Sequence, residues 1–308
     1  MRRTLLVLLA ASIALPAQAR VRRASAATRA EDNPRKRGRA FPKASIAFAA
    51  PPDFSQHAEG AIAIRLLVKG YAMGALRPGG PVPHAHLIVD NDPAMEIPDA
   101  NATWMLGGLS PGPHLLRVVL CRPWHEVVKA PRAFAMVRFW MGPKIPGKAG
   151  RAAESVTWPQ PGKPILTYVL PVGAPSEQLV LARLEENPPD APTDPADAGL
   201  AKPPDPVATP LPGANRPVLD FYLSNAKLGR RGDKIRIVLD RRELPLITDW
   251  KPHPLRGARG GAHRISIDLL SRRGVKVNNV VNRSDRVFTV ESLQRKSGSR
   301  LGDSRLSR

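Results

Sequence analysis

Two stretches of this sequence follow the same pattern, and that duplication limits the possible fold more than any other feature. The first stretch contains AHLIVDN, GGLSPGPHLLRVVL and FAMVRFWMG, and the second contains IRIVLDR, RGARGGAHRISIDLL and DRVFTVES. The aligned pairs are Asp90 with Asp240, Trp104 with Trp250, Gly112 with Gly261, and His114 with His263. The aspartate precedes the histidine by 24 residues in the first copy and by 23 in the second. Matched anchors in the same order predict one structural unit built twice.

Both copies carry the alternation of apolar and polar residues that is typical of short β-strands. IAIRLLV and HLLRVVL in the first copy, and IRIVLD and HRISIDLL in the second, alternate with a period of two and are rich in β-branched residues. Turn sequences such as RPGGP, LSPGPH and RRGD separate them. PILTYVLPVG and PVLDFYLSNAKL have the character of the opening strands of the second unit. The sequence therefore predicts an all-β chain of two tandem antiparallel β-sandwiches.

A Gly-x-His-x-apolar-x-apolar motif begins a predicted strand at Gly112 and again at Gly261. This motif resembles the start of the penultimate strand in bacterial immunoglobulin-like and fibronectin type III-like extracellular modules. The resemblance covers roughly residues 60–142 and 165–290. It implies two immunoglobulin-like sandwiches whose role is to bind, space or stiffen, and it carries over no catalytic residue.

Composition divides the rest of the chain into arms and linkers. The predicted organisation is a signal peptide at 1–19, a basic disordered arm at 20–43, sandwich 1 at 44–142, a linker at 143–163, sandwich 2 at 164–290 with a proline-rich insertion at 187–217, and a basic disordered tail at 291–308. The insertion holds ten prolines in 31 residues, so we expect it to be extended and mobile. The segment 176–186 before it could form a short helix.

The N-terminus predicts an exported protein. Arg2 and Arg3 precede an apolar run, and a small-x-small site ends at Ala19, which is the order of a cleaved signal peptide. We expect cleavage after Ala19 and a periplasmic or extracellular location, with no transmembrane segment in the mature chain. Cys121 is the only cysteine, so no intramolecular disulfide can form, and the sandwiches must rest on their hydrophobic cores.

The formal charge of +21 is not evenly spread along the chain. Residues 20–43 hold nine Arg and Lys against two acidic residues. A basic arm outside the cytoplasm favours anionic envelope polymers or lipid headgroups as partners, rather than nucleic acid. The alternative is a solvated arm without a partner.

Each copy also serves as an internal control for the other. Residues that both copies keep are expected to serve the fold: Trp104 and Trp250 as packing anchors, His114 and His263 as hydrogen-bonding groups of a loop. Asp90 and Asp240 end a strand, where a carboxylate can accept hydrogen bonds from turn N–H groups. Residues found in one copy only are free to have a specific task.

The strongest candidate for such a task is PHAHLIVDND, residues 83–92. His84 and His86 are two apart on a predicted strand, so their side chains point to one face, and Asp90 has the same parity. Two imidazoles and a further donor could bind Zn²⁺ or Cu²⁺. The matching positions of the second copy are Lys234 and Arg236, so the fold itself does not require histidine there. The alternative is an exposed strand face on which histidine has no role.

The second candidate is CRPWHEVVKAPRAF, residues 121–134, in a predicted loop that has no counterpart in the second copy. Trp124, His125, Glu126 and Lys129 could form an exposed surface that binds a sugar or peptide. The alternative is a tryptophan folded back over the edge of the sandwich.

Neither a nucleophile motif nor a phosphate-binding glycine loop occurs, so we expect no enzyme and no cofactor. The sequence predicts an exported, non-enzymatic binding or scaffolding protein associated with the cell envelope. A periplasmic copper- or zinc-binding protein is the alternative function.

Overall fold

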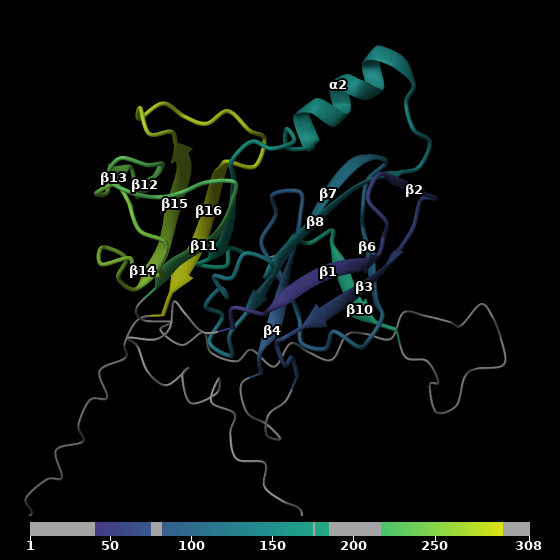
Figure 1. Ribbon diagram of the computed structural model, residues 1–308, viewed down its shortest axis with the longest axis horizontal. Helices are drawn as coiled ribbons and strands as arrows, with labels where there is room; N and C mark the ends of the chain where they lie inside the picture. Colours follow the sequence, from purple (N-terminus) through teal and green to yellow (C-terminus); the bar gives the residue numbers. More distant parts are fainter. Residues whose placement is uncertain (1–40, 75–81, 175, 185–216, 292–308) are drawn as a thin grey trace, which may run out of the picture. The chain divides into compact units, whose positions relative to one another are not determined.

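The two copies of the sequence pattern fold as two β-sandwiches with the same strand order (Figure 1). We describe them from a computed structural model, which describes residues 41–74, 82–174, 176–184 and 217–291. The strands of the first sandwich are β1 (Ser45–Ala50), β2 (Ser55–His57), β3 (Ile62–Lys69), β4 (His84–Val89), β5 (Met95–Ile97), β6 (Trp104–Gly107), β7 (Gly112–Cys121), β8 (Phe134–Met141) and β10 (Val180–Arg183). Those of the second are β9 (Ile165–Leu170), β11 (Val218–Ser224), β12 (Lys234–Leu239), β13 (Arg242–Glu243), β14 (His253–Pro254), β15 (Gly261–Leu270) and β16 (Arg283–Val290).

Each sandwich contains the same two sheets. One sheet is β1-β3-β6 in the first sandwich and β9-β11-β14 in the second. The other is β5-β4-β7-β8 in the first and β13-β12-β15-β16 in the second. Strand for strand, the order is that of immunoglobulin-like and fibronectin type III-like sandwiches, which confirms the predicted fold class. Two further strands extend the first sandwich only: β2 runs parallel to β8, and β10 runs antiparallel to β6.

A duplicated corner explains the aspartates and histidines that both copies keep. In the first sandwich the Asp90 carboxylate accepts hydrogen bonds from Leu115 N at 2.8 Å and from His114 Nδ1 at 2.8 Å. In the second, the Asp240 carboxylate accepts from Arg264 N at 2.9 Å and lies 2.7 Å from His263 Nδ1. Both aspartates have a positive φ, at 49° and 48°. The shared residues therefore fix the same turn twice, as the copy comparison predicted.

The two shared tryptophans are packing anchors, but they are not equivalent in every respect. Trp104 begins β6 and donates its indole N–H to the Asp99 carbonyl, whereas Trp250 lies in a bend before β14 and donates to the Phe221 carbonyl. Trp104 packs on the first core, and Trp250 packs on both cores.

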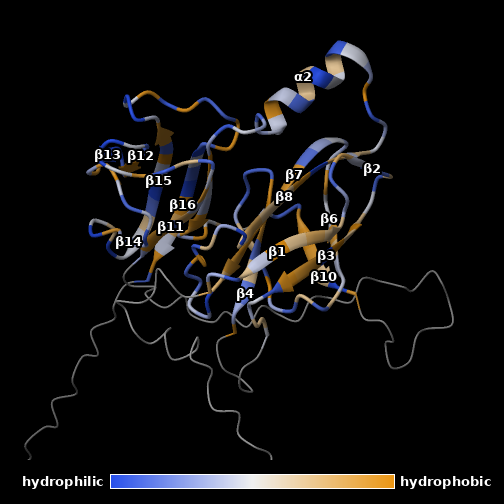
Figure 2. Ribbon diagram, viewed as in Figure 1, coloured by the Kyte–Doolittle hydropathy of each residue, from blue (hydrophilic) through white to orange (hydrophobic). Residues whose placement is uncertain are grey.

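The two sandwiches differ in the burial of the equivalent strands β4 and β12. Strand β12 buries every second residue, as expected when one face covers a core and the other faces water. Strand β4 is buried on both faces, and Figure 2 colours much of the neighbouring β7 and β8 as hydrophobic. Ala85 and Leu87 belong to one face of β4, and His84 and His86 belong to the other. The histidine face is thus covered in the first sandwich, although it is the outer face in the second.

Two segments differ from the sequence prediction. Residues 143–163, expected to be a linker, contain helix α2 (Gly147–Thr157), which follows Pro146 and includes an alanine-rich turn. Residues 176–186, expected to form a helix, contain strand β10, which pairs with β6 of the first sandwich. The chain thus returns to the first sandwich after starting the second with β9.

Several predicted segments lie outside the described residues: the signal peptide, nearly all of the basic arm, nearly all of the proline-rich insertion and the tail from 292 onward. In the part of the chain that the structure describes, none of the helices combines the length and apolar character that a membrane span requires.

Candidate metal site

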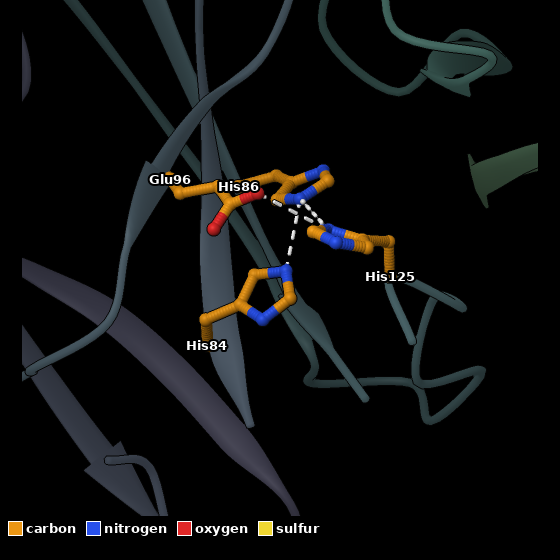
Figure 3. A group of neighbouring side chains, drawn as sticks. All are labelled: His84, His86, Glu96 and His125. Carbon is orange, nitrogen blue, oxygen red and sulfur yellow. Dashed lines mark hydrogen bonds and ion pairs between the residues drawn. The ribbon is translucent and has the colours of Figure 1, made fainter. Parts of the chain in front are cut away.

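Three histidines and a glutamate from three segments of the first sandwich point their ligand atoms at one another (Figure 3). His84 and His86 lie on one face of β4, and Glu96 of β5 is paired directly opposite His86. His125 comes from the turn that links Cys121 to Val127. The ligand atoms of all four residues lie within 4.8 Å of one another.

The distances within this cluster match those between ligands of one metal ion. His84 Nε2 lies 3.0 Å from His86 Nε2, and His86 Nε2 lies 3.2 Å from His125 Nδ1. His125 Nδ1 lies 3.3 Å from Glu96 Oε1. Two ligands of a tetrahedral Zn²⁺ ion with bonds of about 2.0–2.1 Å are about 3.3 Å apart. These three distances therefore lie close to tetrahedral spacing, and the other distances among the four ligand atoms do not exceed 4.8 Å.

Protons alone cannot satisfy these contacts when the rings are neutral. His84 Nδ1 lies 2.8 Å from the Val82 carbonyl and donates its proton there, so His84 Nε2 presents a lone pair. If His86 Nε2 carries a proton, it can donate to the lone pairs of both His84 Nε2 and His125 Nδ1, but the His125 Nδ1 lone pair then faces the Glu96 carboxylate at 3.3 Å. If His125 Nδ1 donates to His86 instead, the lone pairs of His84 and His86 face each other at 3.0 Å. A cation between the three nitrogens would satisfy all of them at once.

The surroundings favour neutral imidazoles. His84 and His86 are each 1 % exposed, and His125 is 2 % exposed. Burial lowers the pKa of His86 well below its ordinary value, and the neighbouring His84 and His125 lower it further. Burial also lowers the pKa of His84, and burial together with His84 lowers the pKa of His125 to about 4. Neutral imidazole is the form that binds metals, so the site needs to release little or no imidazole proton on binding.

The turn that carries His125 does have a structural counterpart in the second sandwich, which corrects the sequence comparison. His125 N donates to Arg122 O at 2.8 Å, and Gly274 N donates to Ser271 O at 2.8 Å. The bridge from Cys121 to Val127 corresponds to a second bridge, from Leu270 to Lys276. His125 has a φ of 62°, and Gly274 has a φ of 78°. The first copy therefore places a histidine in a left-handed position that the second copy fills with glycine.

The second sandwich has no such cluster at the equivalent strand positions. Lys234 and Arg236 of β12 take the places of His84 and His86, because their partners across the strand pair occupy corresponding positions of β15. The Arg236 guanidinium instead forms an ion pair with Asp268. The strand pairing thus equates the same positions that the sequence comparison equated.

Asp90, predicted as the third donor, is not part of the cluster among the described residues. Its carboxylate accepts from His114 and Leu115, and its positive φ turns the chain away at the end of β4. Equal parity places two side chains on one face only while the strand continues, and β4 ends at Val89. Glu96 and His125 occupy the ligand positions that Asp90 was expected to share.

The residues of the predicted sugar- or peptide-binding surface are placed mostly inside the protein. Trp124 is partly buried and donates its indole N–H to Glu126 Oε2 at 2.8 Å, and Glu126 is 7 % exposed. The side chain of Lys129 is 6 % exposed and lies 2.6 Å from Asp220 Oδ1. His125 belongs to the cluster with His84, His86 and Glu96. The loop is therefore folded against the sandwich, and its four named residues do not form one exposed surface.

Glu96 was not among the predicted site residues, and His125 was predicted as part of a different candidate site from His84 and His86. Finding Glu96 requires the register of β4 on β5, and a three-residue strand gives little pattern for that register. Finding the role of His125 requires aligning two turns of different sequence. The glycine at position 274 was the available signal, because turns often place glycine at a positive φ.

Comparisons with known proteins found matches among solved structures only. No family model and no curated protein matches the sequence. Among solved structures, fibronectin(III)-like modules of Clostridium thermocellum CbhA align with 11% identity, a TM-score of 0.23, and coverage of 85% of this chain and 100% of that chain. The central fibronectin-III array of RIM-binding protein aligns with 8% identity, a TM-score of 0.23, and coverage of 82% and 70%. The Bacteroides ovatus mixed-linkage glucan utilization locus protein SGBP-B, solved with a heptasaccharide, aligns with 12% identity, a TM-score of 0.19, and coverage of 80% and 70%.

Proposed function

We propose that this protein binds one divalent transition-metal ion through His84, His86, His125 and Glu96. The observation that carries the proposal is the convergence of three buried imidazole nitrogens and the Glu96 carboxylate, whose close contacts neutral rings cannot all satisfy with protons. Imidazole suits both Zn²⁺ and Cu²⁺, and the three ligand–ligand distances of 3.0–3.3 Å fit a tetrahedral Zn²⁺ ion. Glu96 has a side chain that is 53% exposed, so it would be the ligand closest to solvent.

The proposal is tested by metal titration of the protein without an affinity tag, after chelation and dialysis. We expect Zn²⁺ to bind with a stoichiometry of one in isothermal titration calorimetry, and Cu²⁺ to compete for the same site. The double variant His84→Ala/His86→Ala should lose this binding. The control is Lys234→Ala/Arg236→Ala, which changes the equivalent positions of the second sandwich and should bind as the wild type does. Equal affinity in the wild type and the histidine variant would rule the site out.

A second proposed role is electrostatic adhesion to anionic envelope polymers or lipid headgroups by residues 20–43. It rests on the nine basic and two acidic residues of that segment. Such adhesion should weaken strongly between low and high salt, because ions screen exposed charges. Co-sedimentation with anionic and neutral vesicles, using the mature chain with and without residues 20–43, measures it. If adhesion persists at high salt, or persists after residues 20–43 are deleted, this role is contradicted.

A further inference from the structure

A buried carboxylate of the second sandwich holds the hairpin that carries His125. Asp220 of β11 is fully buried. Its Oδ2 atom accepts a hydrogen bond from Val127 N at 2.8 Å, and its Oδ1 atom lies 2.6 Å from Lys129 Nζ. Val127 is two residues from His125. A carboxylate of the second sandwich therefore anchors a segment of the first.

Tyr222, two residues further along β11, supports the same segment. Its hydroxyl donates to the Ala130 carbonyl at 2.7 Å, and its ring stacks on Phe134 with centroids 5.0 Å apart. Residues two apart on a strand share a face. Asp220 and Tyr222, on one face of β11, thus contact the hairpin at Val127, Lys129 and Ala130, all on the C-terminal side of His125.

The position of His125 depends on these contacts of β11 with the hairpin. His125 has a positive φ at the tip of the turn, and its two backbone anchors are the hydrogen bond to Arg122 O and the Val127 bridge to Cys121. The N–H group of Val127 is held by Asp220. His84 and His86 lie on a regular strand and have no such requirement. His125 is therefore the ligand whose placement rests on the second sandwich.

We propose that metal binding at the histidine cluster is coupled to docking of the second sandwich, with Asp220 as the positioning residue. This inference rests on the proposed metal-binding function. Coupling between two sites is reciprocal. If the contact of Asp220 with the hairpin increases metal affinity, metal binding must stabilise that contact by the same free energy. The second sandwich, which lacks the cluster, then acts as the regulator of the site on the first.

The test compares Asp220→Asn and Tyr222→Phe with Asp268→Asn. The asparagine keeps the size of Asp220 but loses the charge that faces Lys129, and the phenylalanine removes only the hydroxyl that reaches Ala130. Asp268 is the matched control, because it is another buried carboxylate of the second sandwich, is 3% exposed, and pairs with Arg236 rather than with the hairpin.

Two measurements decide the matter. Hydrogen exchange on the metal-free proteins should show faster exchange of residues 122–130 in Asp220→Asn, a smaller change in Tyr222→Phe, and none in Asp268→Asn. Competition with a chromogenic chelator should show Zn²⁺ affinity lowered on the order of ten-fold in Asp220→Asn and unchanged in Asp268→Asn. Adding Zn²⁺ to the wild type should slow exchange at the Val127 amide.

The outcomes separate this inference from the function on which it rests. If the wild type binds no Zn²⁺ or Cu²⁺, the proposed function and the coupling both fall. If the wild type binds and Asp220→Asn binds equally well, only the coupling falls. Equal losses of affinity in Asp220→Asn and Asp268→Asn also overturn it, because the effect would then come from general destabilisation.

Discussion

At the residue scale, the two copies have different residue types at one equivalent backbone position. His125 and Gly274 occupy equivalent left-handed positions of equivalent turns. A left-handed conformation costs a residue with a Cβ atom roughly 1–2 kcal/mol relative to glycine. The first copy accepts this cost at the residue that completes its histidine cluster. Strain of this kind gathers at functional sites, and here the second copy shows what the turn contains without it.

We predict that His125→Gly is more stable than His125→Ala, by about 1 kcal/mol. In ordinary strands and helices the order is the reverse, so the sign of the difference tests the left-handed conformation directly. Urea unfolding of both variants, treated with a chelator, measures the difference. Neither variant should bind metal as the wild type does. If the alanine variant proves the more stable, the turn does not hold His125 as described.

The aspartate–histidine corner makes a separate residue-scale prediction. The bond to the Arg259 carbonyl and the bond to Asp240 raise the pKa of His263. A raised folded pKa means that the stabilisation is fully present below the unfolded value of about 6.5 and is lost as pH rises through the folded pKa. Asp240→Asn removes a negative charge, so the pKa of His263 should fall toward its ordinary value. NMR titration of the imidazole measures this.

His114 is the control for that titration. Burial lowers the pKa of His114, but the hydrogen bond to Asp90, the charge of Asp90 and the bond to the Ser110 carbonyl together outweigh burial, so the pKa is raised. Because Asp90 is untouched in Asp240→Asn, the titration of His114 should not change. An unchanged His263 in the same variant would show that Asp240 does not set its pKa.

At the scale of elements, alternation predicted the strands, and register decided the site. The pattern of IAIRLLV and HRISIDLL was enough to predict β3 and β15, since side chains alternate between the two faces of a strand. The same period correctly placed His84 and His86 on one face. It could not supply Glu96, which reaches the site through pairing of two distant segments, or His125, which reaches it through a turn.

The elements missed by sequence reasoning owe their form to contacts far along the chain. Strand β10 has four residues and pairs with β6, more than 70 positions earlier. An amphipathic segment of that length fits a helix or a strand equally well, and only its partner decides. Helix α2 is anchored by Glu154, which accepts from the Trp140 indole at 2.9 Å. Neither partner is visible from local sequence.

The approach to β10 gives a prediction at the scale of elements. Gly108, after β6, has a φ of 81°, and a Cβ there would lie 1.7 Å from the Gln178 carbonyl oxygen. Gly274 has a φ of 78°, with nothing within 4 Å of the same added atom. Gly274→Ala should cost about 1–2 kcal/mol from backbone strain alone. Gly108→Ala should cost more, because the backbone leading into β10 must also move.

Urea unfolding of the two alanine variants compares these costs at nearly the same φ. Hydrogen exchange at the amides of Val180–Arg183 should rise in Gly108→Ala only. Equal destabilisation in both variants would mean that β10 does not approach β6 as closely as described.

At the scale of the whole molecule, the two sandwiches are joined by buried side-chain packing and hydrogen bonds as well as by the chain that links them. Val169, Leu170 and Tyr222, from strands of the second sandwich, belong to the buried cluster of the first. Asn91 of the first sandwich donates to the Arg283 carbonyl of the second at 2.9 Å. The described residues of both sandwiches belong to one compact unit. The two sandwiches thus have the same strand order, but β4 is buried on the face that corresponds to the outer face of β12.

This arrangement predicts that both sandwiches unfold together. In scanning calorimetry of the wild type, we expect one transition whose calorimetric and van't Hoff enthalpies agree. Tyr222→Ala removes the ring that stacks on Phe134 and the hydroxyl that reaches Ala130, so it should split the transition into two. Leu116→Ala, in the core of the first sandwich, should cost about 2–5 kcal/mol and shift the single transition without splitting it. Two transitions in the wild type would show that the interface is too weak to join the sandwiches, and the second sandwich could not then hold His125 in place.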